Sequence, residues 1–318
     1  MSMSRKIEVV PYNPEWPHMF EEEAARIKQA LGDACVVVHH VGSTAVPKLC
    51  AKPKIDIIAV VKKGVFSIPS LEKIGYDYRG EFNIPFHFGF SKRSPLPNIN
   101  LHVYEEGNSE VELNLLFRDY LRAHPEALEE YANLKLELVK QGFEPKANNV
   151  KVSQFNLGKD AFIKKTLEQA GFNGLGMRFC AHHDEWEAAR HFRNKYFFDR
   201  VPMADPYTWT FDHKDHVHFV FYQGTKIIGY AHIQLWPEQR AALRIIVMDE
   251  LHRNQGLGGY FLTLCERWLK EKGYKTLHTQ SSPDAYNFYR KQGYTEMPFN
   301  DPDGYESDPQ DIDMGKVL

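Results

Sequence analysis

The segment over residues 243–273 most restricts the fold of this chain. It begins with a β-branched run (243–248), continues through a polar stretch (249–255), and has a glycine-rich turn before an amphipathic helical pattern that stops at Gly273. A strand, a glycine turn and a helix N-terminus in this order can form an anion cradle. The reason is that the first N–H groups of the helix have no intrahelical partner and the helix dipole favours negative charge. The segment therefore indicates an α/β domain in which backbone amides hold a phosphate.

A strand, a glycine turn and a helix also occur in this order in structures other than a phosphate cradle. A plain strand-to-helix connection often contains glycine. A dinucleotide-binding turn would need its third glycine in a different place and an acid about 20 residues further on, where this chain has Gln280. A Walker loop is excluded because no Lys-Ser or Lys-Thr follows the glycines. The turn alone leaves a plain connection and a phosphate cradle open.

Two motifs in this half resemble those of the GNAT N-acetyltransferase superfamily. Residues 253–258 (Arg-Asn-Gln-Gly-Leu-Gly) match its Arg/Gln-x-x-Gly-x-Gly/Ala pyrophosphate motif, and residues 285–294 match its Ala-x-x-Phe-Tyr-x-x-x-Gly-Phe segment. The resemblance covers residues 176–318 and implies a mixed sheet flanked by helices that binds acetyl-CoA and acetylates an amine. It also implies cofactor contacts from a strand backbone and from loop amides, at Ile246, Val247, Met248, Arg253, Asn254, Gln255, Gly256, Leu257, Gly258 and Gly259.

The resemblance also implies roles in the chemistry. Tyr289 matches the family's usual acid, which would protonate the departing thiolate. The strand glutamate that some relatives carry is Ala242 here, so Glu238, His232 or an ordered water stay open as the base. We expect a small polar amine as the acceptor. Aromatic residues are candidates for its pocket, with core packing as the alternative role for most of them: Trp186, Tyr196, Phe197, Tyr207 and Trp209.

Two polar stretches of this half have simpler interpretations. His213, His216 and His218 are interpreted as a polar turn entering a strand, because no cysteine and no helical histidine pair accompanies them. We therefore assign no metal ion here. The acidic stretch over residues 300–313 is interpreted as a solvated hairpin loop, with a polycationic acceptor as the alternative.

The N-terminal half has a Gly-Ser turn between two strand-like runs. Gly42 and Ser43 follow the first run (36–41), and Asp56 lies near the start of the second. Such a turn can hold a triphosphate while carboxylates bind magnesium. Only one acid of the usual Asp-x-Asp pair is present here, namely Asp56. Glu112, in the strand-like run 111–115, is the candidate for a further carboxylate. These residues predict a phosphate or metal site whose ligands would be a nucleotide and Mg²⁺.

Residues 7–170 resemble the GrpB-like family. The matching segments are residues 40–47, 51–57, 101–103 and 117–122. The resemblance implies a mixed sheet with helices of the nucleotidyltransferase type, and it defines no activity. Three roles stay open for this half: nucleotidyl or phosphoryl transfer, nucleotide binding, or a non-catalytic domain that supports its neighbour or recruits the acetyl acceptor.

Length and glycine spacing predict two domains. The chain has 318 residues, about twice an average domain. A helical pattern over residues 160–170 runs into three glycines, which suggests a helix stop and a linker. We place the GrpB-like domain at residues 1–172 and the GNAT domain at residues 173–318. The predicted fold class is α/β (α+β), with a mixed sheet flanked by helices in each domain.

Composition and charge exclude other classes of protein. The formal net charge of −3 creates no field that would gather nucleic acid or an anionic membrane. The longest apolar runs, such as residues 55–61, are shorter than the roughly 20 residues that span a bilayer. The start of the chain lacks a secretory pattern, and its 4 cysteines form no Cys-x-x-Cys pair. We therefore expect a cytoplasmic enzyme with a small-molecule partner and leave its oligomeric state open.

Overall fold

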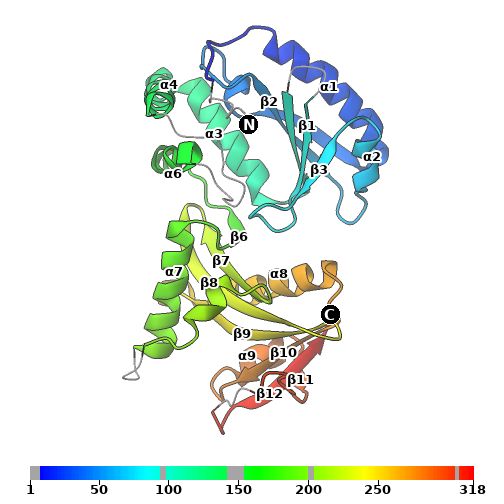
Figure 1. Cartoon of the computed structure of the whole chain (residues 1–318), viewed down its shortest axis with the longest axis vertical. Coiled ribbons are helices and arrows are strands. Elements are labelled where there is room, and N and C mark those ends of the chain that lie inside the picture. Colours follow the sequence, from blue (N-terminus) through cyan, green and yellow to red (C-terminus); the bar gives the residue numbers. More distant parts are fainter. Residues whose placement is uncertain (1–7, 94–97, 142–153, 200–203, 305–307) are drawn as a thin grey trace, which may run out of the picture. The chain divides into compact units, whose positions relative to one another are not determined.

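The computed structural model describes residues 8–93, 98–141, 154–199, 204–304 and 308–318. It divides into two compact units, residues 1–176 with 223–225 and residues 177–222 with 226–318. Each unit is built on a mixed sheet with helices, which confirms the predicted fold class (Figure 1). The domain boundary near Asn173 stays a prediction.

The sheet of the N-terminal unit has the strand order β1-β2-β5-β4-β3. The central pair, β2 and β5, is parallel, and the other neighbours are antiparallel. The strands are β1 (Cys35–Val41), β2 (Lys54–Val61), β3 (Asp77–Gly80), β4 (Phe88–Lys92) and β5 (Asn98–Glu105). The helices are α1 (Trp16–Leu31), α2 (Ile68–Glu72), α3 (Ser109–Ala123), α4 (Pro125–Lys140), α5 (Gln154–Leu157) and α6 (Asp160–Gln169), with short 3₁₀ turns at Gly32–Ala34 and Ser43–Ala45.

Helices pack on both faces of this sheet. Side chains of α1 and the β2 residues Ile55 and Ile57 belong to one buried cluster. Ile58 and Val60 belong to another cluster, against which residues of α3 pack. Because side chains alternate along a strand, Asp56 shares the α3 face with Ile58 and Val60.

One predicted element of this unit is wrong. The strand-like run over residues 111–115 lies inside helix α3. The helix begins there because the Asn108 side chain caps it, accepting a hydrogen bond of 3.0 Å from the Glu110 N–H. Glu110 and Glu112 stand in the first turn, where the helix dipole favours acids.

The sheet of the C-terminal unit has the strand order β11-β12-β10-β9-β8-β7-β6. The strands are β6 (Leu175–Phe179), β7 (His216–Gln223), β8 (Lys226–Trp236), β9 (Arg240–Met248), β10 (Thr276–Ser281), β11 (Thr295–Glu296) and β12 (Ile312–Val317). The longer helices are α7 (His183–Arg193), α8 (Leu257–Glu271) and α9 (Tyr286–Lys291), with short helical turns at Asn194–Phe198, Thr208–Asp212 and Glu250–His252. β9 runs antiparallel to β8 and parallel to β10.

Helix α8 forms where the sequence predicts it. It begins after Gly256, whose φ is 78°, and the chain turns away at Gly273, whose φ is 86°. Both angles lie in the left-handed region that glycine adopts at little cost. The buried side chains recur at helical spacing and anchor α8 in the core: Phe261, Leu262, Cys265, Trp268 and Leu269.

Candidate functional site

Strands β9 and β10 part after a short paired segment. β10 pairs with β9 at three residues, from Arg240 to Ala242, whereas β9 continues beside β8 as far as Met248. The Thr279 hydroxyl on β10 donates to the Leu243 carbonyl at 3.1 Å, where the two strands separate. Beyond this fork, the β10-facing edge of β9 has no partner strand among the described residues. The backbone groups of this edge can pair with an extended polar chain as they would pair with an added strand.

A β-bulge distorts β9 just beyond the fork. Ile245 pairs with His232 of β8 and Leu243 pairs with Ile233, so Arg244 is an extra residue on β9. Bulges bend a strand and redirect side chains, and they are common beside functional sites.

A glycine loop follows the far end of β9. Asn254 and Gly256 have φ values of 59° and 78°, and α8 starts at the next residue, Leu257. The first N–H groups of α8 have no intrahelical partner, and they lie at the positive end of its dipole. The Arg253 Nε donates to the Met248 carbonyl at 3.0 Å, which ties the loop to the strand end. The structure thus brings the sequence-predicted residues 246–248 and 253–259 together at one end of β9.

Tyr289 lies on α9 and is connected to the fork. Its hydroxyl is hydrogen-bonded to the Thr279 side chain, and its side chain is buried, with 7% exposed. Burial raises the pKa of Tyr289 to about 12. The phenol therefore keeps its proton at neutral pH.

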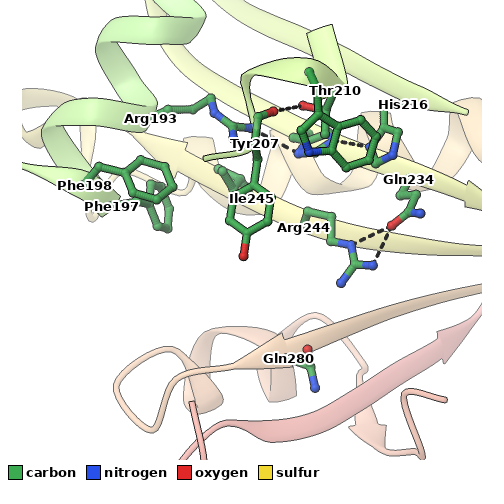
Figure 2. Close-up of a pocket in the computed structure, with 12 residues that line it drawn as sticks. Arg193, Phe197, Phe198, Tyr207, Thr210, His216, Gln234, Arg244, Ile245 and Gln280 are labelled. Carbon is green, nitrogen blue, oxygen red and sulfur yellow. Dashed lines mark hydrogen bonds between the residues drawn. The ribbon is translucent and has the colours of Figure 1, made fainter. Parts of the chain in front are cut away.

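A pocket of about 330 Å³ opens beside the separated strands (Figure 2). Aromatic side chains from the segment before β7 form one part of its wall, and polar side chains from β7, β8, β9 and β10 form another. The lining residues are Arg193, Phe197, Phe198, Tyr207, Trp209, Thr210, His216, His232, Gln234, Arg244, Ile245 and Gln280. Its size suits a small molecule.

A directed hydrogen-bond chain crosses the wall of this pocket. Arg193, which is paired with Asp205 at 2.6 Å, donates from Nη1 to the His232 Nδ1 at 3.3 Å. His232 must then carry its proton on Nε2, which lies 2.8 Å from the His216 Nδ1 and donates to it. Neutral His216 therefore carries its own proton on Nε2. Burial lowers the pKa of His216 to about 4 and that of His232 well below its usual value, so both rings are neutral at pH 7.

The bulge residue Arg244 takes part in a second polar network. Its Nε donates to the Gln234 Oε1 at 2.8 Å, and its Nη2 donates to the carboxylate of Asp301 (Figure 2 shows the Gln234 contact). Gln234 in turn donates to Asp303. The Asp301 side chain is 6% exposed. The interpretation of this acidic stretch as a solvated loop is therefore wrong at Asp301, because the partly buried Arg244 binds it.

Some of the other sequence-predicted candidates line the pocket in the structure, and others do not. Phe197, Tyr207 and Trp209 line the pocket, whereas Trp186 and Tyr196 pack against a buried cluster. His232 lines the pocket as well, but Glu238 lies exposed in the turn between β8 and β9.

Sequence reasoning missed the polar pocket residues Arg193, Thr210, Gln234, Arg244 and Gln280. Gln234 and Arg244 stand inside otherwise apolar strand runs, and a polar side chain in a buried strand is the signal that could have found them. Arg193 ends a helix with several other charged residues, so nothing in the sequence distinguishes it.

The N-terminal unit contains a separate pocket of about 500 Å³, which the Gly42–Ser43 turn helps to line. Gly42 has a φ of 70°, and a Cβ atom there would lie 2.6 Å from the Asp56 Oδ2. Asp56 accepts a hydrogen bond of 2.7 Å from the Asn100 Nδ2, and burial raises its pKa. The structure thus brings Gly42, Ser43 and Asp56 together, as the sequence predicts.

Glu112 does not join them. It lies exposed on helix α3 and is not among the described lining residues of this pocket. Instead, four lysines line it: Lys52, Lys54, Lys135 and Lys159. Burial lowers the pKa values of Lys135 and Lys159 to about 8.

The described residues offer neither a metal site nor a membrane-spanning helix. No three His, Cys, Asp or Glu side chains among them are grouped so as to hold a metal ion. None of the helices in the described ranges is both long and apolar enough to cross a membrane.

The C-terminal half matches the model of the acetyltransferase (GNAT) family over residues 183–294. The fork, the glycine loop and the pocket all lie in the unit that contains this match. This unit is therefore an acyltransferase domain of the GNAT class. Residues 6–169 match the GrpB protein family. Because that match spans more than half of the 318 residues, the chain belongs to the GrpB family, with a GNAT domain attached.

Curated relatives match the N-terminal part of the chain. UPF0157 protein YqkA of Bacillus subtilis is 39% identical over 169 residues, which are 52% of this chain and 48% of the relative. UPF0157 protein BH1888 of Halalkalibacterium halodurans is 37% identical over 167 residues, 52% of this chain and 82% of the relative. The chain thus spans about half the length of the first of them. The crystal structure of conserved protein GrpB from Enterococcus faecalis is 37% identical, covers 51% of this chain and 96% of its own, and has a TM-score of 0.43.

Proposed function

We propose that the C-terminal domain is an N-acetyltransferase that uses acetyl-CoA as donor and a small polar amine as acceptor. The observation that carries this proposal is the fork between β9 and β10, with the glycine loop at one end of β9 and the pocket beside it. No cysteine or serine occurs among the described lining residues of the pocket. This favours direct attack by the amine, with both substrates bound, over an acetylated enzyme.

The chain's groups fit a long phosphorylated thioester. Acetyl-CoA would supply an activated acyl group. The free edge of β9 at Ile246, Val247 and Met248 would pair with its extended arm, because amide groups on that arm can replace a missing strand. The N–H groups of residues 254–259 would bind its pyrophosphate, since successive amides in a loop with left-handed residues converge on an anion.

Tyr289 is the group that would act on the leaving sulfur. In the transfer, a nitrogen–carbon bond forms and the carbon–sulfur bond breaks, so negative charge develops on sulfur. Because the Thr279 hydroxyl donates its own proton to Leu243, the Tyr289 O–H points to the Thr279 oxygen; a neutral phenol could turn that O–H to the developing charge, donate a hydrogen bond and then its proton. The raised pKa of Tyr289 ensures that the proton is present when the charge appears.

The amine proton needs a different route. The described lining residues of the pocket include no carboxylate, and its two imidazoles have low pKa values, which make them weak bases. Since Glu238 lies outside the pocket, we assign proton removal to water and expect the amine to react in its neutral form. The aromatic wall would pack on the apolar part of the acceptor, and the His216 N–H would bind its polar part.

A panel of small amines tests the proposal, with release of free CoA from acetyl-CoA as the measurement. The expected result is amine-dependent CoA release together with a raised melting temperature in the presence of CoA. No CoA release with any amine and no thermal shift with CoA would contradict it. Electron density for CoA at the glycine loop would test the cofactor contacts directly.

The alternative function is nucleotidyl or phosphoryl transfer by the N-terminal domain with Mg²⁺. That chemistry needs at least two converging carboxylates, and Glu112 does not lie beside Asp56 in the pocket. The geometry therefore favours acetyl transfer as the function of this chain. A cytoplasmic location and the absence of a nucleic-acid partner stay proposals of the same kind.

A further inference from the structure

The N-terminal pocket is large enough for an organic ligand. Its volume of about 500 Å³ lies within the range of small-molecule sites, and all its lining residues belong to the N-terminal unit. The site is therefore separate from the proposed acetyl-transfer site, and its interpretation does not depend on that function.

Charge is the feature that distinguishes this pocket. Four lysines and one carboxylate, Asp56, are the charged residues among its described lining, which leaves a formal charge of +3. Lys135 has protein partners, since its Nζ donates to the Ser43 Oγ at 3.2 Å and to the Cys50 carbonyl. The Asp56 charge acts on Lys52, Lys54 and Lys159, the three lysines referred to below as the lysine cluster, but in the described part of the chain none of the three forms an ion pair with a carboxylate.

Two members of the lysine cluster contact the same aromatic ring. The Nζ atoms of Lys52 and Lys159 lie 4.2 and 4.9 Å from the centroid of the Phe155 ring. Two ammonium groups on one ring repel each other in a partly buried site, where their repulsion is stronger than in water. An anion placed between them would remove that repulsion.

The same residues do not suit a two-metal centre. Such a centre needs several carboxylates to balance two divalent ions, and the described lining supplies Asp56 alone. The Asp56 carboxylate is already engaged, because one oxygen accepts from Asn100 and the other lies against the backbone at Gly42. The lysine ammonium groups supply the positive charge that metal ions would supply in a two-metal centre.

We propose that this pocket binds a phosphate-bearing small molecule without a divalent metal, with the lysine cluster as its charge partner. A di- or trianionic phosphate group matches the formal charge of the lining, and the volume leaves room for the organic part that carries it. Inorganic pyrophosphate represents the phosphate chemistry alone, and ATP represents a nucleotide source.

The first test is calorimetric titration of the full-length chain with pyrophosphate in EDTA. Lys52→Gln and Lys159→Gln should each weaken binding by tenfold or more. Lys63→Gln is the matched control, because Lys63 is an exposed lysine beyond the opposite end of β2, and its affinity should equal that of the native chain. A parallel titration with ATP shows whether a nucleotide base adds affinity.

The second test uses Asp56→Asn to distinguish a metal site from a lysine site. The amide keeps an oxygen to accept from Asn100 but removes the negative charge. A lysine site should bind pyrophosphate as tightly as before or more tightly, whereas a metal site should lose binding.

Three outcomes would overturn the proposal: binding that requires Mg²⁺, binding lost in Asp56→Asn, or pyrophosphate affinity unchanged in both lysine variants. The last would place the binding elsewhere, for example at the glycine loop of the other domain. Melting temperatures without ligand check the fold, and we expect those of Lys52→Gln and Lys159→Gln to be at least native, because each removes a repelled charge. CoA release by the same variants shows separately whether acetyl transfer is intact.

Discussion

Tyr289 and Tyr286 occupy the same short helix in different surroundings. Tyr289 is buried and bonded to Thr279 at the fork, whereas the Tyr286 hydroxyl lies 3.3 Å from the exposed carboxylate of Glu296. Only the first contacts a residue at the fork.

Replacing Tyr289 with Phe should lower kcat by about 10²-fold or more, the usual contribution of a general acid. The KM for acetyl-CoA should change little, because the phenol acts on the sulfur only as charge develops. Steady-state kinetics measure both constants, and Tyr286→Phe is the control with the same atom removed. Equal rates in the native chain and Tyr289→Phe would exclude Tyr289 as the acid.

Gly42 is constrained by contact as well as by backbone angle. Gly42 and Gly64 have nearly the same φ, 70° and 71°, but a Cβ at Gly64 would meet no atom within 4 Å, whereas one at Gly42 would overlap Asp56. Gly42→Ala should therefore cost about 2–4 kcal/mol of unfolding free energy, and Gly64→Ala about 1 kcal/mol. Urea unfolding of the two variants measures the difference, and equal losses would mean that Asp56 moves aside freely.

At the scale of elements, one substitution in the glycine loop before helix α8 should act in opposite directions on stability and on cofactor binding. Asn254→Asp places an acid near the positive end of α8 while keeping a residue type that tolerates its φ of 59°. The charge should leave stability unchanged or raise it by about 0.3–1 kcal/mol. It should also raise the KM for acetyl-CoA by about tenfold, because it repels the pyrophosphate.

Asn300→Asp is the control for this charge, since Asn300 is exposed and also has a positive φ, of 46°. Its KM for acetyl-CoA should equal the native value. An unchanged KM in Asn254→Asp would mean that the pyrophosphate lies elsewhere.

Strands and helices with strong local patterns could be predicted from the sequence. The runs that became β2, β8 and β9 are long and apolar, and α8 has both a helical period and glycines at its ends. The run over residues 111–115 is too short to distinguish a period of 2 from one of 3.6, and the Asn108 cap that decides it acts from outside the run.

The two parts of the candidate site in the C-terminal unit also differ in whether they could be predicted from the sequence. The cofactor loop could be predicted because its residues are contiguous, and its chemistry is carried by the backbone. The pocket beside it could not, because Arg193, Gln234 and Gln280 come from three separate elements that only the folded sheet brings together. The aromatic wall comes from irregular segments, whose positions no sequence period indicates.

At the scale of the whole molecule, both units keep partly or fully buried histidines neutral. Burial lowers the pKa to about 4 at His40, His87 and His102 in one unit and at His216 in the other. Their ordinary value is about 6.5. Between these values the unfolded chain binds more protons than the folded chain, so the free energy of unfolding decreases as the pH falls from 6.5 towards 4.

The melting temperature should therefore fall steadily from pH 7 to pH 4.5. His87→Gln should flatten that dependence, because it removes one buried site that resists protonation, even though it lowers stability at pH 7. His18→Gln, at an exposed position, should leave the slope as it is. Thermal scans across this pH range compare the slopes, and equal slopes for His87→Gln and His18→Gln would contradict the assignment.

The strand order of the C-terminal sheet has a consequence for how the domain assembles. In the described sheet, β11 pairs with β12 alone, and β12 lies between it and β10, although β12 follows β11 in the chain. β11 therefore belongs to the sheet only through its pairing with β12. The strand at the edge of the sheet is therefore not the last to be synthesised, and losing the pairing of β12 would detach β11 as well.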